Sequence, residues 1–438
     1  MLQTVPLAEL ATMPPVKDGQ SRLYLKITRR LIPILFLSYT AAYVDRVNVG
    51  FAKLQMLSDL HFSEATYGLG AGIFFVGYFL FEVPSNIVLS RIGARRWIAS
   101  IMLIWSVFSL ATIFVRTPLP YYLLRFGLGA TEAGLFPGII LYLTYWYPPS
   151  RRGKVISLFM TGIPVSGLIG GPLSGWILHS MSGSYGIAGW RWLFMLEATP
   201  SVIMSLIIFL FLDDDATQAK WLSPVERDEV AERVLAEHGD IVSHSMRDGF
   251  ANPMVWIMSA IYLCFTAGLY AVGFWLPTLI KGIGVKDTLS VGLLSAIPYL
   301  AATIAMIVVG RSSDRRRERR WHITVPALVG LLGWIISIRF EHDIAIAMIG
   351  LTIATIGVMT TVSQFWCLPT GILTGAAAAV GVAIINSIGN LSGALVPYLV
   401  GIVVDATKST DLAVYMLASI ITVGGLCVLT IPKHLTDR

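Results

Sequence analysis

Charged side chains are scarce in this 438-residue sequence. Asp, Glu, Lys and Arg together make up 13% of it, whereas soluble globular proteins contain about 25%. Hydrophobic residues make up 55%, and the mean hydropathy is +0.72. So little charge cannot cover the surface of a soluble particle of this size, which excludes soluble, secreted and disordered classes. The composition predicts a polytopic membrane protein.

Other absences narrow the chemistry. The three cysteines lie inside apolar runs, so we expect small buried hydrophobic side chains and no disulfide framework. All seven histidines fall in loops, in tails or at span ends, which argues against a histidine proton relay or metal site. No Gly-Lys pair is followed by Ser or Thr, so the sequence contains no P-loop. No nucleophile and base are suitably spaced for catalysis, so we expect a carrier that needs no cofactor and is not an enzyme.

Long apolar runs dominate what is present. A helix that crosses a bilayer needs about 20 mostly apolar residues. Twelve runs meet this length, at about 31–52, 66–90, 96–115, 120–147, 154–179, 190–212, 253–280, 288–310, 322–339, 344–367, 372–404 and 412–431. The eleventh is long enough to be kinked or to end before Asp405. The predicted fold class is an all-α polytopic membrane protein with twelve transmembrane helices in two six-helix bundles.

A single long polar stretch, 213–252, separates the sixth run from the seventh. Within it, 225–238 is typical of a surface helix, with Ser223 as N-cap, Pro224 at the first helical position and Glu226 completing a capping box. In chain order, the expected organisation is an N-terminal tail at 1–30, a bundle at 31–212, a linker at 213–252, a second bundle at 253–431 and a C-terminal tail at 432–438.

The basic residues indicate the topology. Nineteen Lys and Arg lie in the tails and loops on the side of the two termini, and seven lie in the opposite loops. Because cytoplasmic loops carry the excess of basic residues, both termini are expected to be cytoplasmic. This distribution also accounts for the net charge of +6, so we expect contact with membrane lipid and none with nucleic acid.

A loop motif occurs twice. It reads Asn86-x-x-x-Ser90-Arg91-x-Gly93-x-Arg95-Arg96 after the second run and Gly310-x-x-x-Asp314-Arg315-Arg316-Arg317 after the eighth, 224 residues later. The repeat indicates two related halves, an arrangement common in secondary transporters, which bind substrate between the halves. Short basic loops also follow from the topology rule alone, so this reading stays open.

Ionisable groups within the apolar runs mark candidate functional positions, because each costs about 3 kcal/mol to insert. Arg125 and Glu132 are seven residues apart and therefore share one helix face. Asp45 and Arg46 are adjacent and should point in different directions, one toward the fourth span and one into a cavity. A buried arginine suits a carboxylate substrate, and a neighbouring carboxyl can carry a proton. A static ion-pair lock between spans one and four is the structural alternative.

The remaining polar groups are distributed unevenly between the halves. Glu82 and Glu197 lie near span ends, which favours interfacial or gate positions. In the second half, the interiors of the spans offer uncharged polar groups instead: Tyr262, Tyr270, Gln364, Asn386 and Asn390. The first half is therefore expected to handle charge, and the second to select shape.

Seven strings in order resemble one transporter family. They are Tyr43-Val-Asp45-Arg46-Val-Asn48, Phe81-Glu82-Val-Pro84-Ser-Asn86, Arg125-x6-Glu132-Ala-Gly-Leu-Phe-Pro137, Gly189-Trp190-Arg191-Trp192-Leu-Phe, Ala219-Lys220-Trp221-Leu222, Phe274-Trp275-Leu-Pro277 and Asn386-Ser-Ile-Gly389-Asn390-Leu-Ser-Gly393. Together with the spans, they resemble the major facilitator superfamily over essentially the whole chain, and within it the anion:cation symporter family. The most similar branch transports tartrate, phthalate and 4-hydroxyphenylacetate. The first loop motif departs from the family pattern at Asn86 and Ser90, which leaves the loop lock in doubt there.

The resemblance implies a function. It implies uptake of a small organic carboxylate with protons, by alternating access, across the inner membrane. Nothing in the sequence demands more than a monomer. By motif match, Asp45 and Glu132 are the proton-coupling pair, and Arg46 and Arg125 couple to them or to substrate. The predicted substrate-binding set also includes, from the first half, Tyr43 and Tyr78, and from the second, Tyr270, Gln364, Trp366, Asn386 and Asn390.

Alternatives stay open at this point. Gly167-x-x-x-Gly171-Pro172-x-x-Gly175 resembles the signature of proton-coupled drug antiporters, although Trp176 replaces its final glycine. Close packing of helices through small residues explains the same string. A neutral sugar or polyol carrier would use the amides and tryptophans of the second half. A non-transporting receptor is disfavoured, because the 40-residue linker leaves little room for a signalling domain.

Overall fold

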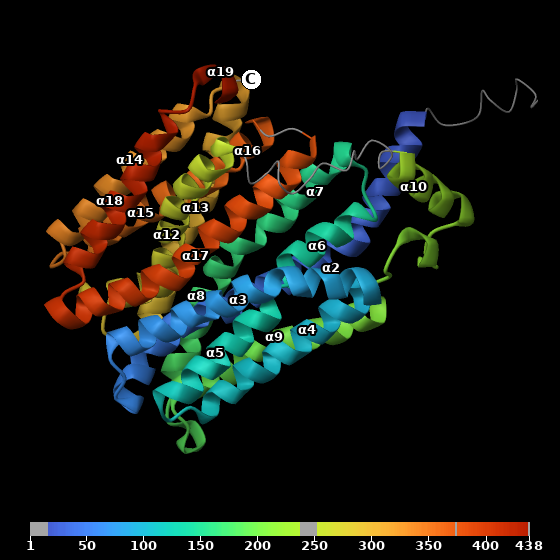
Figure 1. Ribbon diagram of the computed structural model, residues 1–438. Coiled ribbons are helices and arrows are strands. Elements are labelled where there is room, and N and C mark those ends of the chain that lie inside the picture. The colour runs from blue at the N-terminus through green and yellow to red at the C-terminus, as the bar shows by residue number, and fades with distance from the viewer. Residues whose placement is uncertain (1–15, 237–251, 373–374, 437–438) are drawn as a thin grey trace, which may run out of the picture.

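The computed structural model describes residues 16–236, 252–372 and 375–436, and every regular element in these ranges is helical (Figure 1). The first half contains α2 (Val16–Leu60), α3 (Glu64–Ile92), α4 (Ala94–Ala111), α5 (Pro118–Glu132), α6 (Leu135–Thr144), α7 (Pro149–Met160), α8 (Gly162–Ser180) and α9 (Gly189–Phe211). The linker contains α10 (Pro224–Ala236). The second half contains α12 (Pro253–Gly282), α13 (Thr288–Arg316), α14 (Arg320–Arg339), α15 (Ile344–Phe365), α16 (Cys367–Ile372), α17 (Gly375–Thr407), α18 (Asp411–Val428) and α19 (Lys433–Thr436).

The membrane-spanning helices agree with the expected runs with one difference. Among the described residues, eleven segments are long and apolar enough to cross a membrane, against twelve expected. The expected first span, 31–52, lies within α2, which has 45 residues and is long enough. It is less apolar than the others because it carries Asp45, Arg46 and Asn48. The protein is an all-helical, multi-span membrane protein.

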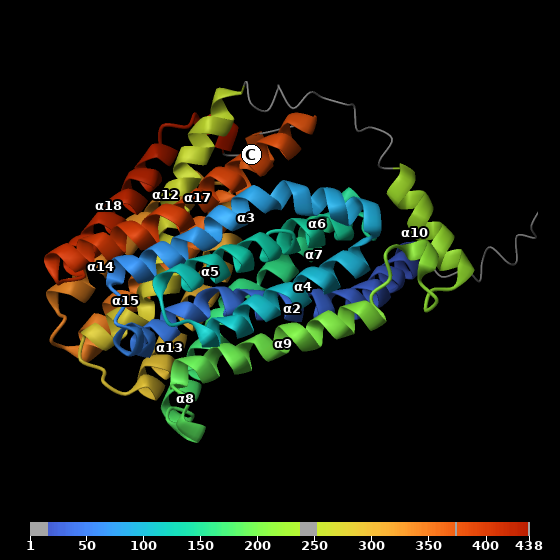
Figure 2. The ribbon, with the colours of Figure 1, turned by 60° about the horizontal axis from the view of Figure 1, so that its bottom comes forward.

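The two halves form adjacent bundles, coloured blue to green and yellow to red in Figure 1. α3 packs along α17, α8 along α13 and α2 along α12, and α3 and α17 lie side by side in both Figure 1 and Figure 2. Glycine permits these close approaches. A Cβ atom on Gly72 of α3 would lie 2.3 Å from the carbonyl oxygen of Ala394 in α17. The interface between the halves therefore depends on positions without side chains.

The glycine string of α8 takes part in this interface. A Cβ atom on Gly175 would lie 2.7 Å from the carbonyl oxygen of Thr288 and 2.8 Å from Cα of Gly292, both in α13. Gly171 likewise meets Gly292, whose carbonyl oxygen would lie 3.0 Å from an added Cβ. This geometry supports the interpretation of the string as a helix-packing motif, so the string gives no argument for drug antiport.

The linker packs against the first half. The predicted capping box is confirmed: the Ser223 amide donates to Glu226 Oε2 at 2.8 Å, and the Glu226 amide donates to Ser223 Oγ at 3.3 Å. The helix it opens, α10, ends at Ala236, and the last two residues of the expected segment lie outside the described residues. Lys26 Nζ of α2 donates to Glu226 Oε2 at 2.7 Å, and Trp221 stacks on Trp146 with ring centroids 5.8 Å apart.

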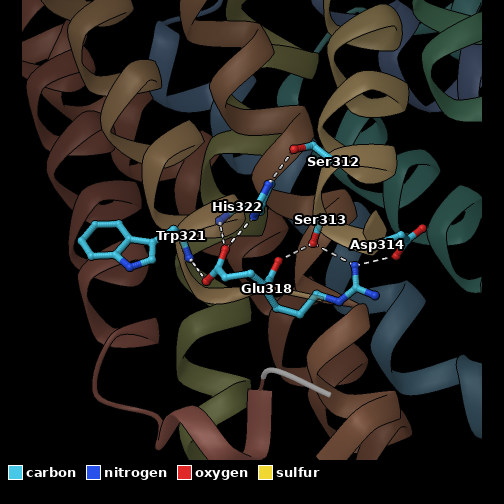
Figure 3. Close-up of polar contacts among 7 residues, drawn as sticks. Ser312, Ser313, Asp314, Glu318, Trp321 and His322 are labelled. Atoms are coloured by element: carbon cyan, nitrogen blue, oxygen red, sulfur yellow. Dashed lines mark hydrogen bonds and ion pairs between the residues drawn. The ribbon is translucent and has the colours of Figure 1, made fainter. Parts of the chain in front are cut away.

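The two copies of the loop motif are held differently. In the second copy, Asp314 pairs with Arg319 at 2.6 Å, and the Ser313 hydroxyl donates to the carbonyl of Glu318 (Figure 3). The Glu318 carboxylate in turn accepts from the amide of Trp321 at 2.7 Å, which caps α14. In the first copy, which lacks the aspartate, Asp214 of the linker accepts from the amide of Arg95 at 2.8 Å.

Polar contacts join the halves at the end where α2 finishes and α3 begins, which we call the joined end (residues 50–68, 274–292 and 397–405). Asp405 lies inside α17, so the alternative that this helix ends before it is wrong. Its carboxylate accepts from the amides of Glu64 and Ala65, at 3.2 and 2.7 Å, in the first turn of α3. On the neighbouring helices, His179 contacts Asp287 at 2.7 Å.

Candidate functional site

The candidate site is built on one face of α5. The buried residues of this helix are Tyr121, Arg125, Leu128, Gly129 and Glu132, which repeat with helical spacing. Arg125 and Glu132 are only 1% and 2% exposed. The predicted shared face of these two charged residues is therefore present, and it points into the protein rather than toward lipid.

Arg46 of α2 forms an ion pair with Glu132. Its Nε donates to Glu132 Oε1 at 2.9 Å, and its Nη2 donates to the same oxygen. Three aromatic rings surround the guanidinium, with Cζ 5.2 Å from the centroids of Tyr43 and Tyr78 and 5.4 Å from that of Phe74. A cation in such a box is attracted to the ring faces in addition to its carboxylate. Arg46 is thus the residue of α2 that points toward the fourth span.

Arg125 has a different environment. Its Nε, Nη1 and Nη2 are all buried and have no hydrogen-bond acceptor among the described residues. Its Cζ lies 5.1 Å from the centroid of Phe74, the ring that also contacts Arg46. The hydroxyls of Tyr67 and Tyr121 are among its electrostatic neighbours. A guanidinium with its donors unused inside a protein is costly, and a carboxylate matches its fork geometry.

Asp45 points away from this pair. Its Oδ1 accepts from Ser109 of α4 at 3.0 Å, and its Oδ2 accepts from Ser201 of α9, also at 3.0 Å. Asn48 donates weakly to Oδ1, at 3.4 Å. Asp45 and Arg46 do point in different directions, but Asp45 packs among the hydroxyls of spans three and six and not into a cavity. Its side chain is 1% exposed.

Several predicted residues of the second half face the arginine pair. The Tyr270 hydroxyl donates to Asn390 Oδ1 at 2.5 Å, and it is among the electrostatic neighbours of Arg46. Asn386 Nδ2 donates to Oε1 of Glu82 at 3.5 Å, and the Ser387 hydroxyl donates to Oε2 at 3.4 Å. Glu82, expected at an interface or gate, therefore bridges the two halves.

Of two further predicted residues, Gln364 lies apart from this group and Trp366 borders it through Tyr262. A Cβ atom on Gly310 of α13 would lie 3.3 Å from the amide nitrogen of Gln364, so Gln364 faces the α13 side of α15. Trp366 packs edge-on against Tyr262, with centroids 4.8 Å apart. The structure thus brings together Tyr43, Tyr78, Tyr270, Asn386 and Asn390 with the charged residues, and it does not place Gln364 among them. The roles of all these residues in transport stay predictions.

Three residues that contact the charged groups of the site were not predicted from the sequence. Phe74 contacts both arginines, and Ser109 and Ser201 hold Asp45. A phenylalanine or a serine within an apolar run carries no signal that separates it from its neighbours. Glu197, expected near an interface, is instead 1% exposed and accepts from the Ser174 hydroxyl at 2.6 Å.

Comparison with known proteins adds independent information. A family model described as Major Facilitator Superfamily matches residues 35–397. "Putative metabolite transport protein NicT" of Pseudomonas putida is 46% identical over 99% of this chain and 100% of its own length. "Putative tartrate transporter" of Agrobacterium vitis is 41% identical, covering 95% of this chain and 92% of that protein. "Quinolone resistance transporter" of Acinetobacter baumannii is 37% identical, covering 91% of this chain and 92% of that protein.

Solved structures agree with the fold. The xylose transporter XylE from E. coli, in an inward-open conformation, matches with a TM-score of 0.74 over 93% of this chain and 97% of that chain. The sequence identity in this match is 13%, so the likeness concerns the fold alone.

Proposed function

The chain belongs to the Major Facilitator Superfamily, and from this premise we propose that it takes up a small organic carboxylate together with protons. A secondary transporter of a metabolite follows from the family and from its relatives. The finer proposal, a tartrate-like hydroxy or dicarboxylic acid or an aromatic acid, is supported by the relative named "Putative tartrate transporter".

One observation carries the choice of an anion. Arg125 is 1% exposed, and none of its three guanidinium nitrogens has an acceptor among the described residues. Arg46, close to the same phenylalanine ring, is already paired with Glu132. A substrate carboxylate beside Arg125 would supply the missing acceptors, whereas a neutral sugar would leave the cation unpaired. Arg125 is therefore proposed to receive the carboxylate.

Proton coupling is proposed to act through Glu132 and Asp45. Protonation of Glu132 would remove the charge that holds Arg46 and would free a second guanidinium for the anion. Loss of the proton would restore the Arg46–Glu132 pair and weaken anion binding. The contacts thus provide a competition between proton-dependent pairing and substrate for the same cations.

The orientation follows from the basic loops. The second-copy loop with its arginines lies at the opposite end of the helices from the joined end, and basic loops face the cytoplasm. We infer that both termini are cytoplasmic and that the joined end is the outer one. In this arrangement the structure represents a conformation that is closed toward the outside.

Ligand-dependent thermal stability tests the substrate class. Detergent-purified protein is heated with L-tartrate, 4-hydroxyphenylacetate, xylose or the quinolone norfloxacin. A ligand present at about 100 times its dissociation constant should stabilise the folded state by roughly 2.7 kcal/mol. A stabilising effect of tartrate or 4-hydroxyphenylacetate that is lost in Arg125→Ala is the expected result.

A conservative substitution tests the arginine itself. Arg125→Lys keeps the charge but not the bidentate fork, so the affinity for the stabilising acid should fall at least about tenfold, or roughly 1.4 kcal/mol. Arg116→Lys, at an exposed position before α5, is the matched control and should bind normally. Near-normal affinity in Arg125→Lys would make Arg125 a structural residue. Stabilisation by xylose alone would overturn the proposed anion substrate.

Drug export is a second candidate, favoured by the relative named as a quinolone resistance transporter. Quinolones are themselves carboxylates, so they could use the same arginine. The direction of transport separates the two functions. Uptake of the acid into proteoliposomes driven by an inward proton gradient supports symport, and proton-driven extrusion of norfloxacin supports export.

A further inference from the structure

A second group of buried polar side chains lies in the first bundle beside Asp45. It is centred on Glu197 of α9 and includes Asn48 of α2, Ser174 of α8 and Ser109 of α4. All of them, with Asp45, are at most 2% exposed. Nothing in the proposed transport site uses Glu197, and a carboxyl at this depth in a membrane protein is a functional candidate.

Hydrogen-bond donors are shared unequally between the two carboxyls. Asp45 accepts hydrogen bonds from three donors, Ser109, Ser201 and, more weakly, Asn48. Glu197 accepts from one donor, Ser174, at Oε1. Its Oε2 is buried and has no hydrogen-bond partner among the described residues, and the same holds for Oδ1 of Asn48. Both unpartnered atoms are acceptors, and Asn48 is a hydrogen-bonding neighbour of Glu197 that faces the carboxyl with its amide NH₂ group.

Among the described residues, no positively charged group pairs with Glu197 to offset the cost of burying its negative charge. Asp45 of α2 is its titratable neighbour, and α8 contributes only the Ser174 hydroxyl. From α4, Ser109 and the Trp105 indole face Asp45, and from α5 Arg125 and Glu132 also interact with Asp45. Among the described residues, neither Asp45 nor Glu197 is part of an ion pair. Two buried carboxylates side by side repel each other, so one of them is expected to hold a proton.

We propose that Glu197 is a proton-binding site: Oε2 takes the proton, and a half-turn of the Asn48 amide group about its Cβ–Cγ bond brings Oδ1 round to accept from it. One proton then satisfies both unpartnered acceptors and removes the repulsion from Asp45. Glu197, with one donor, is neutral, and Asp45, with three, keeps its charge. When the proton leaves, it passes to water as a hydrated proton and the carboxylate remains.

The binding of this proton is inferred from the geometry alone, whereas its role in coupling proton and substrate transport rests on the proposed function. Asp45 and Arg46 are consecutive residues of α2, so a change at the Asp45–Glu197 pair reaches the Arg46–Glu132 pair through a single peptide unit. Glu197 would then be a third carboxyl in proton coupling, besides Asp45 and Glu132.

A sodium ion is the competing occupant, because carboxylate, hydroxyl and amide oxygens can also coordinate a monovalent cation. The described residues contain no group of three or more His, Cys, Asp or Glu that could hold a metal ion. Because the same oxygens suit a proton or a sodium ion, the test must distinguish a bound proton from bound sodium.

Infrared difference spectroscopy of the whole purified protein is the direct measurement. A protonated carboxylic acid shows a C=O stretching band that shifts in D₂O, whereas a carboxylate does not show this band. Wild type minus Glu197→Gln, at neutral pH without sodium, should contain such a band. Glu232→Gln, at an exposed position of α10, is the matched control and should retain the band. An unchanged band in Glu197→Gln overturns the proposal.

Two further measurements test whether the band belongs to a protonated Glu197. Ser174→Ala keeps Glu197 but removes the donor to its Oε1, so the band should move to higher frequency, and an unmoved band overturns the assignment. Loss of the wild-type band on adding sodium chloride, but not choline chloride, would also overturn it in favour of a cation site. Because Glu197→Gln resembles the neutral acid in shape, its melting temperature should match that of the wild type.

The spectroscopic test needs no substrate, so it separates the two proposals. If neither tartrate nor another acid is transported while the Glu197 band is present, the proposed function fails and the proton site stands. If proton-driven tartrate uptake is found but the band does not depend on Glu197, the proton site fails alone. If both hold, Glu197→Gln should lower the number of protons taken up per tartrate.

Discussion

Asp405 provides a sharp test of how the two halves are held together. It belongs to α17 of the second half, yet its carboxylate accepts from the amides of Glu64 and Ala65 at the start of α3 in the first half. An anion at a helix N-terminus is stabilised by the free amide groups and by the helix dipole. Asp405→Asn removes the charge and leaves a single acceptor oxygen for the two amides.

The magnitude can be worked from these contacts. A hydrogen bond to a charged group contributes about 1.5–3 kcal/mol. Asp405 is partly exposed, so the lower value is appropriate for the one bond that is lost. We therefore expect the joined conformation to lose about 1.5 kcal/mol relative to one in which the halves separate at this end. This corresponds to roughly a tenfold shift in the equilibrium between the two conformations.

The shift is measured as a distance distribution between two spin labels. Ser182→Cys and Lys286→Cys place labels on exposed positions of opposite halves, close to the His179–Asp287 contact at the joined end. The native cysteines, Cys264, Cys367 and Cys427, are first replaced by alanine. In detergent, Asp405→Asn should increase the long-distance population about tenfold relative to the short one.

A matched substitution and a clear negative result complete this test. Asp411→Asn changes an aspartate of α18 in the same half whose amide bonds to Ser409, within its own half, and should leave the distribution unchanged. An Asp405→Asn distribution indistinguishable from that of the parent would refute the idea that this carboxylate joins the halves. The same holds for an equal change in both variants.

Two other predictions concern charge and pH. Glu132→Gln cannot form the ion pair with Arg46, so proton-driven uptake of the acid should be lost while substrate exchange across proteoliposomes continues, and accumulation at the wild-type level would contradict the proposed role. In the linker, burial opposes ionisation of Glu226, but the hydrogen bonds from Lys26 and from the Ser223 amide hold the pKa of its carboxyl below its usual range. The folded pKa is below the unfolded one, so this contact stabilises α10 fully above about pH 4.3 and is lost as pH falls further. Hydrogen exchange of α10 as a function of pH measures this, with Glu226→Gln as the pH-independent reference.

Local patterns explain which features could be predicted from the sequence. Spans follow from length and hydropathy, and the α10 cap follows from Ser223, Pro224 and Glu226 within four residues of each other. The shared face of Arg125 and Glu132 follows from helical periodicity alone. Each of these predictions uses residues within one helix, where geometry is fixed by the backbone.

Contacts between distant helices could not be predicted in the same way. The sequence does not reveal that Arg46, rather than Arg125, pairs with Glu132, because that choice depends on how α2 is rotated against α5. It gives no reason for Asp214 to occupy the place of the missing loop aspartate, 119 residues from the Arg95 amide that it accepts from. The partners of Asp45 are serines, which are common in apolar helices and carry no pattern.

The placement of charge on α2 and α5 constrains how proton and anion can be linked. Arg125 and Glu132 are fixed seven residues apart on one helix, so α5 cannot exchange their partners by itself. Arg46, by contrast, lies next to Asp45 on α2, and the two side chains reach α5 on one side and α4 and α9 on the other. A rotation of α2 that separates Arg46 from Glu132 would also break the hydrogen bonds that Ser109 and Ser201 donate to Asp45. The proposed proton sites and the proposed anion site would therefore be coupled by the position of one helix, and a mutation in α2 should uncouple them.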